Sequence, residues 1–190
     1  MLKRIRHTLT SIPKYIIGLL IFRLVGGVAH ARYRGVTVGN NCRIYIRQFG
    51  TEPFLITIGN RVTITSGVQI ITHDGSTALI RNDAGRRYLR YANVKIGDDV
   101  FIGINSIILP GITIGSRVVI GAGAVVTRDI PENSVAVGNP ARVVGSFDSF
   151  KSRVTSSFIN ERELDNISGY RNKVCRAILL GSKDSGIKNI

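Results

Sequence analysis

A six-residue repeat is the feature that most restricts how this 190-residue chain can fold. From Ile96 to Val126 an aliphatic residue stands at every sixth position, and a small or aliphatic residue follows each one four positions later. The aliphatic positions are Ile96, Ile102, Ile108, Ile114, Ile120 and Val126, and the glycines that directly follow four of them are Gly97, Gly103, Gly115 and Gly121. A helix would show a period of about 3.6 residues and an ordinary strand a period of about 2. The spacing therefore indicates short strands joined by tight corners.

The same register occurs upstream at Val38, Ile58, Ile64 and Ile70. Each six-residue unit forms one side of a coil, and three units close a triangular coil of about 18 residues. The aliphatic side chain points inward and stacks on its counterpart one coil away, while glycine is expected to supply the backbone freedom of the corner. Coincidental spacing in a glycine-rich β protein does not explain so long an unbroken register.

This run resembles the hexapeptide-repeat, or left-handed parallel β-helix, acyltransferases over about residues 36–144. Its most specific segments are residues 101–103, 108–111, 114–127 and 138–141, which are similar to the xenobiotic, maltose and galactoside O-acetyltransferases and to the sugar O-acetyltransferases of surface-polysaccharide synthesis. The resemblance implies a left-handed coil, a homotrimer with sites between subunits, and acetyl-CoA as co-substrate. The predicted fold class is all-β, a left-handed parallel β-helix with a projecting loop and short helical segments at both ends.

Three regions are predicted along the chain. Residues 1–35 form a basic, partly apolar helical segment, residues 36–145 form the repeat domain, and residues 146–190 form a basic tail with a short helix near residues 170–180 and partial disorder. The register breaks after Ile70, and a polar loop at about residues 76–91 leaves the coil there. Loops that project from a rigid scaffold commonly carry function.

His73 stands just before this loop and is the only histidine of the repeat region. Transfer of an acetyl group to an alcohol requires removal of the hydroxyl proton, and imidazole, with a pKa of about 6.5, suits that task near neutral pH. The position also matches the catalytic histidine of the resembling family, so His73 is predicted to be the general base. Adjacent residues of a strand face opposite sides, so Asp74 is not expected to orient the imidazole. In the family an upstream Asn or Asp often helps, but residues 47–52 offer no secure match, and the orienting group is left open.

The resemblance also implies where acetyl-CoA is bound. The predicted contacts are Gly103, Ile104, Ala122, Gly123, Thr127, Arg128 and Arg142. Small residues would let the pantetheine arm approach the backbone, and the two arginines would meet its phosphates unless they are only solvated surface charge. Ile104 replaces a small polar residue of the family, so main-chain contact alone is expected there.

The predicted substrate-binding residues are Asp74, Arg81, Arg86 and Arg87. With Arg90, the loop arginines form a basic patch that would recognise an anionic sugar or a diphosphate-linked glycan. Solubilising charge on a flexible loop is the competing interpretation. No metal is expected: a γ-type carbonic anhydrase on the same coil needs three zinc-binding histidines, whereas His7 and His30 lie outside the repeats. Neither Cys42 nor Cys175 has metal-ligand spacing.

The formal net charge of +14 would also suit a nucleic-acid binder. The charge, however, gathers before residue 35, at residues 81–90 and after residue 142, and no DNA- or RNA-binding motif is present. A nucleic-acid partner is therefore not predicted.

The N-terminal segment has some features of a secretion signal. A basic start precedes the apolar residues 15–22, and residues 29–31 have the small-x-small form of a cleavage site. Arg23, however, interrupts an apolar run that is shorter than the roughly 18 residues of a membrane span. We expect a cytoplasmic protein whose basic helix lies on the inner membrane surface or caps the domain.

The predicted function is acetyl transfer from acetyl-CoA to a hydroxyl of a sugar or glycan precursor in cell-surface polysaccharide biosynthesis. Two alternatives remain open, an N-acyltransferase of an amino sugar and a non-enzymatic β-helix scaffold at the membrane surface. The sequence does not identify the acceptor.

Overall fold

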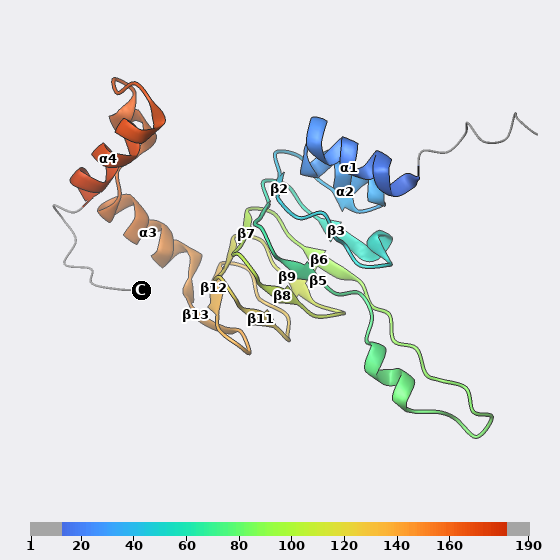
Figure 1. Ribbon diagram of the computed structural model, residues 1–190. Helices are drawn as coiled ribbons and strands as arrows, with labels where there is room; N and C mark the ends of the chain where they lie inside the picture. Colours follow the sequence, from blue (N-terminus) through green and yellow to red (C-terminus); the bar gives the residue numbers. More distant parts are fainter. Residues whose placement is uncertain (1–12, 182–190) are drawn as a thin grey trace, which may run out of the picture. The chain divides into compact units, whose positions relative to one another are not determined.

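The repeats fold into a coil of short parallel strands (Figure 1). This computed structural model describes residues 13–181, and the chain divides into two units, Met1–Val144 and Gly145–Ile190. The strands are β1 (Thr37–Val38), β2 (Arg43–Ile44), β3 (Ile56–Ile58), β4 (Thr63–Ile64), β5 (Gln69–Ile70), β6 (Val94–Ile96), β7 (Val100–Ile102), β8 (Ile107–Ile108), β9 (Thr113–Ile114), β10 (Val118–Ile120), β11 (Val125–Val126), β12 (Ser134–Val137) and β13 (Arg142–Ser146). Within the described residues they form three sheets, ordered β1-β3-β6-β9, β13-β12-β10-β7-β4-β2 and β11-β8-β5.

Strand register confirms the stacking that the repeat predicts. Ile96 pairs with Ile58 in one neighbouring coil and with Ile114 in the next, and all three side chains are buried. Ile64, Ile102 and Ile120 stack in the same way in a second sheet, and Ile70, Ile108 and Val126 in the third. Each of these stacked positions thus removes an aliphatic side chain from water, which is the main source of stability of such a coil.

The repeat glycines serve a purpose other than the predicted one. They do not adopt positive φ; instead, a Cβ on Gly103 would lie 2.5 Å from the amide nitrogen of Ala122 in the next coil. A Cβ on Gly97 would lie 2.8 Å from the carbonyl carbon of Gly115. Left-handed corner positions are instead held by glycines outside the aliphatic-Gly pairs, Gly67, Gly111 and Gly123, and by six other residues with φ between 54° and 59°, Asn41, Arg61, Asp99, Asn105, Arg117 and Asn133. The glycines that follow the aliphatic positions are therefore required for close approach of successive coils.

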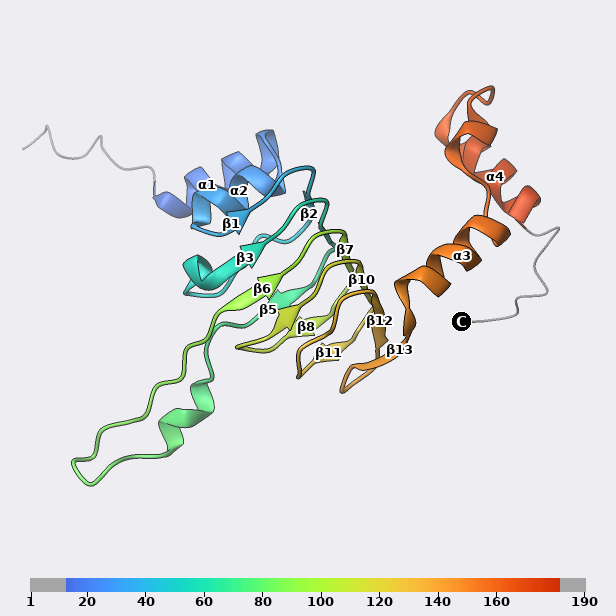
Figure 2. The same ribbon diagram turned by 180° about the vertical axis from the view of Figure 1, so that it is seen from behind.

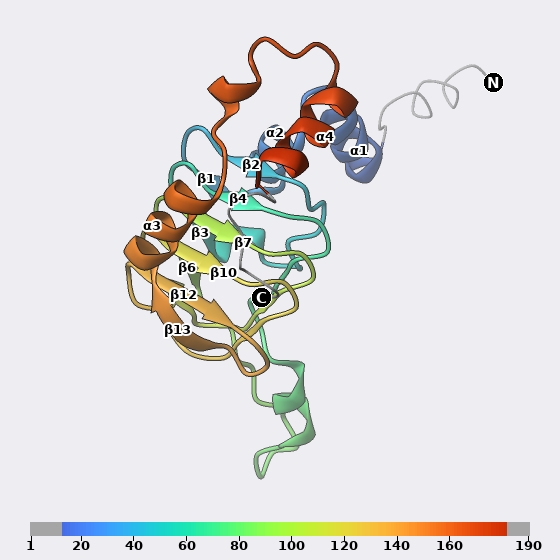
Figure 3. The same ribbon diagram turned by 90° about the vertical axis from the view of Figure 1, so that its left-hand side faces the viewer.

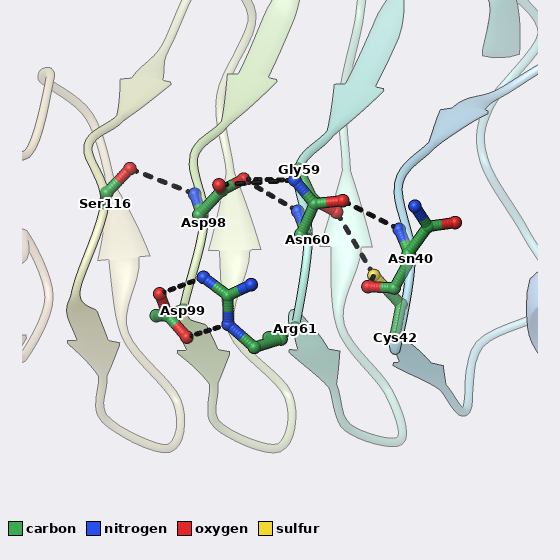
Figure 4. Close-up of polar contacts among 8 residues, drawn as sticks. All are labelled: Asn40, Cys42, Gly59, Asn60, Arg61, Asp98, Asp99 and Ser116. Atoms are coloured by element: carbon green, nitrogen blue, oxygen red, sulfur yellow. Dashed lines mark hydrogen bonds and ion pairs between the residues drawn. The ribbon is translucent and has the colours of Figure 1, made fainter.

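One corner of the coil carries a ladder of polar side chains (Figure 4). The side-chain oxygen of Asn60 accepts the amide of Asn40 at 2.9 Å, and Asp98 accepts the amide of Asn60 at 2.7 Å. The hydroxyl of Ser116 accepts the amide of Asp98 at 3.0 Å. Asp98 and Ser116 are 18 positions apart, whereas Asn60 and Asp98 are 38 apart, so one coil contains a large insertion.

That insertion is a two-limbed arm that leaves the coil between β5 and β6 (Figures 1 and 3). The arm begins at Thr72, whose carbonyl accepts the amide of Ala92 at 2.9 Å, and it is therefore longer than the predicted loop 76–91. His73 is bridged to Tyr91 at its base. One limb contains the short 3-10 helix η2 (Gly75–Leu79).

Two helices precede the coil, α1 (Lys14–Leu24) and α2 (Gly27–Arg34). Helix α1 packs on α2, which in turn contacts β1 and β2 (Figure 2). His30 is buried, and its ring nitrogens lie 2.8 Å from the carbonyl oxygen of Gly18 and 2.9 Å from that of Arg47. The presumed cleavage motif at residues 29–31 is thus part of a packed helix. Within residues 13–181, no helix combines the length and the apolar character needed to cross a bilayer.

The second unit is helical. It contains α3 (Phe147–Ser157), the 3-10 helix η3 (Glu161–Leu164) and α4 (Tyr170–Gly181). The helix predicted near residues 170–180 is present, but α3 was not predicted, although the hydroxyl of Ser146 caps it by accepting the amide of Ser149 at 3.1 Å. The label all-β therefore applies to the coil alone.

Some predicted features lie outside the described residues. These are the basic start of the chain (Lys3, Arg4, Arg6 and His7) and the end of the predicted tail. The division of the chain at residues 35 and 145 remains a prediction.

Candidate functional site

His73 lies where the arm leaves the coil. Strand β5 ends three residues before it, and the bridge to Tyr91 joins the two limbs at this point. Its side chain is 43% exposed, and its ring centroid lies 6.0 Å from that of Tyr91. The backbone bridge thus fixes His73 at the base of the arm, and its imidazole remains partly exposed to solvent.

Glu52 is the group that orients this imidazole. It stands directly before the 3-10 turn η1 (Pro53–Leu55), and its Oε2 lies 3.0 Å from His73 Nδ1. The same oxygen accepts a hydrogen bond from the Thr72 hydroxyl at 2.7 Å, and Oε1 accepts one from the Thr51 hydroxyl. The Glu52 side chain is only 16% exposed.

These contacts keep Glu52 ionised. Hydrogen bonds from Thr51 and then Thr72, together with His73, lower the pKa of Glu52 to about 2, against an opposing effect of desolvation. Glu52 is therefore a carboxylate near neutral pH and only accepts hydrogen bonds. In neutral His73, Nδ1 carries the proton donated to Glu52, which leaves the lone pair of Nε2 free to act as a base.

Sequence reasoning missed Glu52. It lies 21 positions before His73, in a segment between β2 and β3 that has no hexad register. Periodicity therefore gave no indication of the direction in which its side chain points. The weak signal that existed was the upstream Asn or Asp of the resembling family, for which residues 47–52 offered no secure match.

Asp74 has a different role from His73. Its carboxylate accepts hydrogen bonds from the amide of Ser76 at 3.0 Å and from the Ser76 hydroxyl at 2.6 Å, which caps η2. Those bonds, and to a smaller extent the Arg90 guanidinium 3.7 Å away, hold the pKa of Asp74 below its usual value. Asp74 therefore caps the 3-10 helix of the arm, and its hydrogen bonds go to Ser76 and not to the imidazole of His73.

A cavity of about 540 Å³ lies beside His73. It is lined by residues of three successive coils and of the arm: Ile71, His73, Asp74, Gly75, Arg90, Leu109, Pro110 and Thr127. Three of the predicted site residues, His73, Asp74 and Thr127, therefore share one cavity.

The other predicted cofactor contacts lie elsewhere on the chain. Gly103 and Ile104 follow β7, and Ala122 and Gly123 follow β10, so these four residues gather at a different corner, where the Gly123 amide donates to the Ile104 carbonyl at 2.8 Å. Arg128 is exposed, and Arg142 Nη1 donates to the carbonyl of Ala141 at 2.9 Å. Within a single chain, these predicted cofactor contacts therefore do not line the cavity beside His73.

The predicted loop arginines lie along the arm. Arg81 donates to the carbonyl of Gly85 at 2.8 Å, and Arg86 and Arg87 are exposed. Arg90 is the member of the patch that lines the cavity with His73. The patch therefore extends outward from the cavity.

A parallel coil of hexads with a carboxylate-paired imidazole beside a cavity is suited to group transfer. Residues 93–128 match the family described as bacterial transferase hexapeptide (six repeats). The chain is 50% identical over 129 residues to Protein CapG of Staphylococcus aureus, which covers 65% of this chain and 73% of that protein. It is 42% identical to a maltose O-acetyltransferase structure from Clostridium difficile 630, with a TM-score of 0.51 and 60% of each chain covered.

A hexapeptide-repeat acetyltransferase of Vibrio cholerae, complexed with acetyl coenzyme A, shares the fold with a TM-score of 0.50 at 23% identity, over 70% of this chain and 85% of that one. The chain thus belongs to the hexapeptide-repeat transferase family, as its sequence indicated. Membership implies a left-handed coil, and the likeness to the maltose O-acetyltransferase supports acyl transfer as the class of reaction.

Proposed function

We propose that the protein transfers the acetyl group of acetyl-CoA to a hydroxyl of a sugar or glycan precursor in cell-surface polysaccharide biosynthesis. The observation that carries this proposal is the His73–Glu52 pair beside a cavity on a coil of this family. The matched relatives that act on sugars, such as the maltose O-acetyltransferase, support a sugar acceptor. The need for acetyl-CoA favours a cytoplasmic reaction.

The proposed reaction uses His73 as base and then as acid. Nε2 takes the proton of the acceptor hydroxyl while the oxygen attacks the thioester carbonyl carbon. The C–S bond then breaks, and the imidazolium returns its proton to the departing thiolate, so that an ester and free CoA are formed. Glu52 stabilises the imidazolium in between and holds the ring with Nε2 toward the substrates.

The predicted acetyl-CoA contacts support a site shared between subunits of a homotrimer. Thr127 lies beside His73, whereas the Gly103–Ala122 corner is a separate corner of the same chain. Under this proposal, the His73 corner of one subunit faces the Gly103 corner of the next. The narrow, glycine-lined backbone there suits an extended pantetheine chain.

An assay of thiol release from acetyl-CoA with a panel of neutral and anionic sugars tests the function. Mass spectrometry of the product should show one added acetyl group that mild alkali removes, as expected for an ester. An alkali-stable product would instead establish N-acylation, and no product with any acceptor would contradict the proposal.

The arm arginines should contribute to recognition of anionic acceptors. A variant with glutamine in place of Arg81, Arg86, Arg87 and Arg90 should have a higher KM for anionic sugars. Unchanged acceptor kinetics would show that these arginines do not recognise the acceptor.

Glu52→Gln should lower kcat at least roughly tenfold, because an amide can present its NH₂ to Nδ1, favour the wrong tautomer and no longer stabilise imidazolium. The KM for acetyl-CoA should change little, since Glu52 lies behind the ring. Steady-state kinetics of Glu52→Gln and Glu52→Asp would check this, with partial activity expected from the aspartate because it keeps the charge. Equal activity of wild type and both variants would show that Glu52 is only structural.

A further inference from the structure

Helix α1 leaves one apolar stripe uncovered. Ile16, Leu20 and Leu24 recur every fourth residue and therefore lie on one face of the helix, where they are 43%, 49% and 78% exposed. The opposite side of the helix packs on α2 through the buried Gly18. Nothing within the described part of the chain's first unit covers the stripe.

The surroundings of the stripe are positively charged. Glu52 is the first acidic residue of the sequence, so the segment before it carries basic charges alone. The described basic side chains of the two helices are Lys14, Arg23, Arg32 and Arg34. Arg23 lies three residues after Leu20 and is therefore next to the stripe on the helix surface. An apolar stripe beside cationic charge suits the boundary of a bilayer that contains anionic lipid. A second copy of the same surface would instead bring like charges together.

A groove connects this helix to the proposed catalytic base. It encloses about 1370 Å³ and is lined by Lys14 and Tyr15 of α1 and by His73. Tyr33 and Tyr45 add aromatic faces on which sugar rings can stack, and amide side chains such as Gln69 can bond hydroxyl groups. The groove is more than twice the volume of the cavity on the arm side of His73 and suits an elongated acceptor.

We propose that α1 lies on an anionic membrane surface and that this groove receives the glycan of a lipid-linked acceptor from that membrane. The inference rests on the proposed function, because it takes His73 as the base that activates the acceptor. The stripe Ile16–Leu20–Leu24 enters the headgroup region, and the cations around it meet lipid phosphates. The groove runs along the other side of α1, where Lys14 and Tyr15 line it, so the diphosphate-linked glycan reaches it from the membrane around this helix.

Co-sedimentation of the full chain with vesicles tests the membrane contact. Vesicles of phosphatidylcholine with about a third phosphatidylglycerol should bind the protein, and pure phosphatidylcholine should bind it at least about fivefold more weakly. Leu20→Gln with Leu24→Gln should weaken binding to the anionic vesicles about tenfold or more, because both side chains are exposed and their loss does not disturb the core. Leu79→Gln, at an 84% exposed site on the arm, is the matched control and should bind as wild type.

Equal binding by wild type and the Leu20–Leu24 variant, or no preference for anionic lipid, would overturn the membrane contact. A concentration-dependent oligomer that this variant abolishes, without vesicle binding, would assign the stripe to a second copy instead. His73→Ala should bind vesicles normally while it loses acetyl transfer. Normal vesicle binding by a wild-type protein that acetylates no acceptor would fault the proposed function and not the membrane contact.

The groove is tested separately with Tyr45→Ala. Its KM for the acceptor should rise at least about threefold, while the KM for acetyl-CoA and vesicle binding stay unchanged. An unchanged KM for the acceptor would show that the groove does not bind the acceptor.

Discussion

His73→Ala should lower kcat/KM for acetyl transfer by about a hundredfold to ten-thousandfold, the usual contribution of a general base. The imidazole is the group that the structure pairs with an ionised carboxylate while leaving one ring nitrogen free, and alanine offers no base in its place. The melting temperature should change by no more than a few degrees, since the side chain is half exposed and its backbone bridge to Tyr91 is kept.

The control for this variant is Leu79→Ala, a substitution on the same arm at an exposed side chain, which should retain activity within about twofold. Acetyl-CoA affinity, measured by calorimetry, should be the same for wild type and His73→Ala. Acetyl transfer that survives His73→Ala undiminished would refute the mechanism, whatever the fold.

Ile96→Ala should lower the free energy of unfolding by about 2–5 kcal/mol, because it empties a position that is 3% exposed and aligned with Ile58 and Ile114 in the coils on either side. The neighbouring Lys95→Ala should change it by less than about 0.5 kcal/mol, since Lys95 points outward from the same strand. Urea denaturation at one fixed protein concentration would measure both, because assembly would make stability depend on concentration.

A comparable loss in the two variants would mean that the inward–outward alternation is not what stabilises the coil. A loss for Ile96→Ala below about 1 kcal/mol would mean that the neighbouring coils collapse around the missing side chain.

The coil could be predicted from the sequence because its rule is local. Where the repeat is unbroken, it places a residue 18 positions from its stacking partner, so spacing alone identifies partners such as Ile102 and Ile120. The function of the repeat glycines was predicted incorrectly, because a local rule of spacing says nothing about contacts between coils. Spacing identifies a corner, but only the packed coils show that the backbone of Ala122 occupies the space of a Cβ on Gly103.

The sequence by itself determined the stacked hexads, the break at which the arm leaves the coil and the candidacy of His73, since each follows from an order of residues read over a short distance. The tertiary structure decided which carboxylate faces His73. Glu52 lies outside the repeat, and its side chain reaches the imidazole only because the turn at η1 and the base of the arm are packed together. The direction of a side chain outside a regular register depends on such packing, which no spacing encodes.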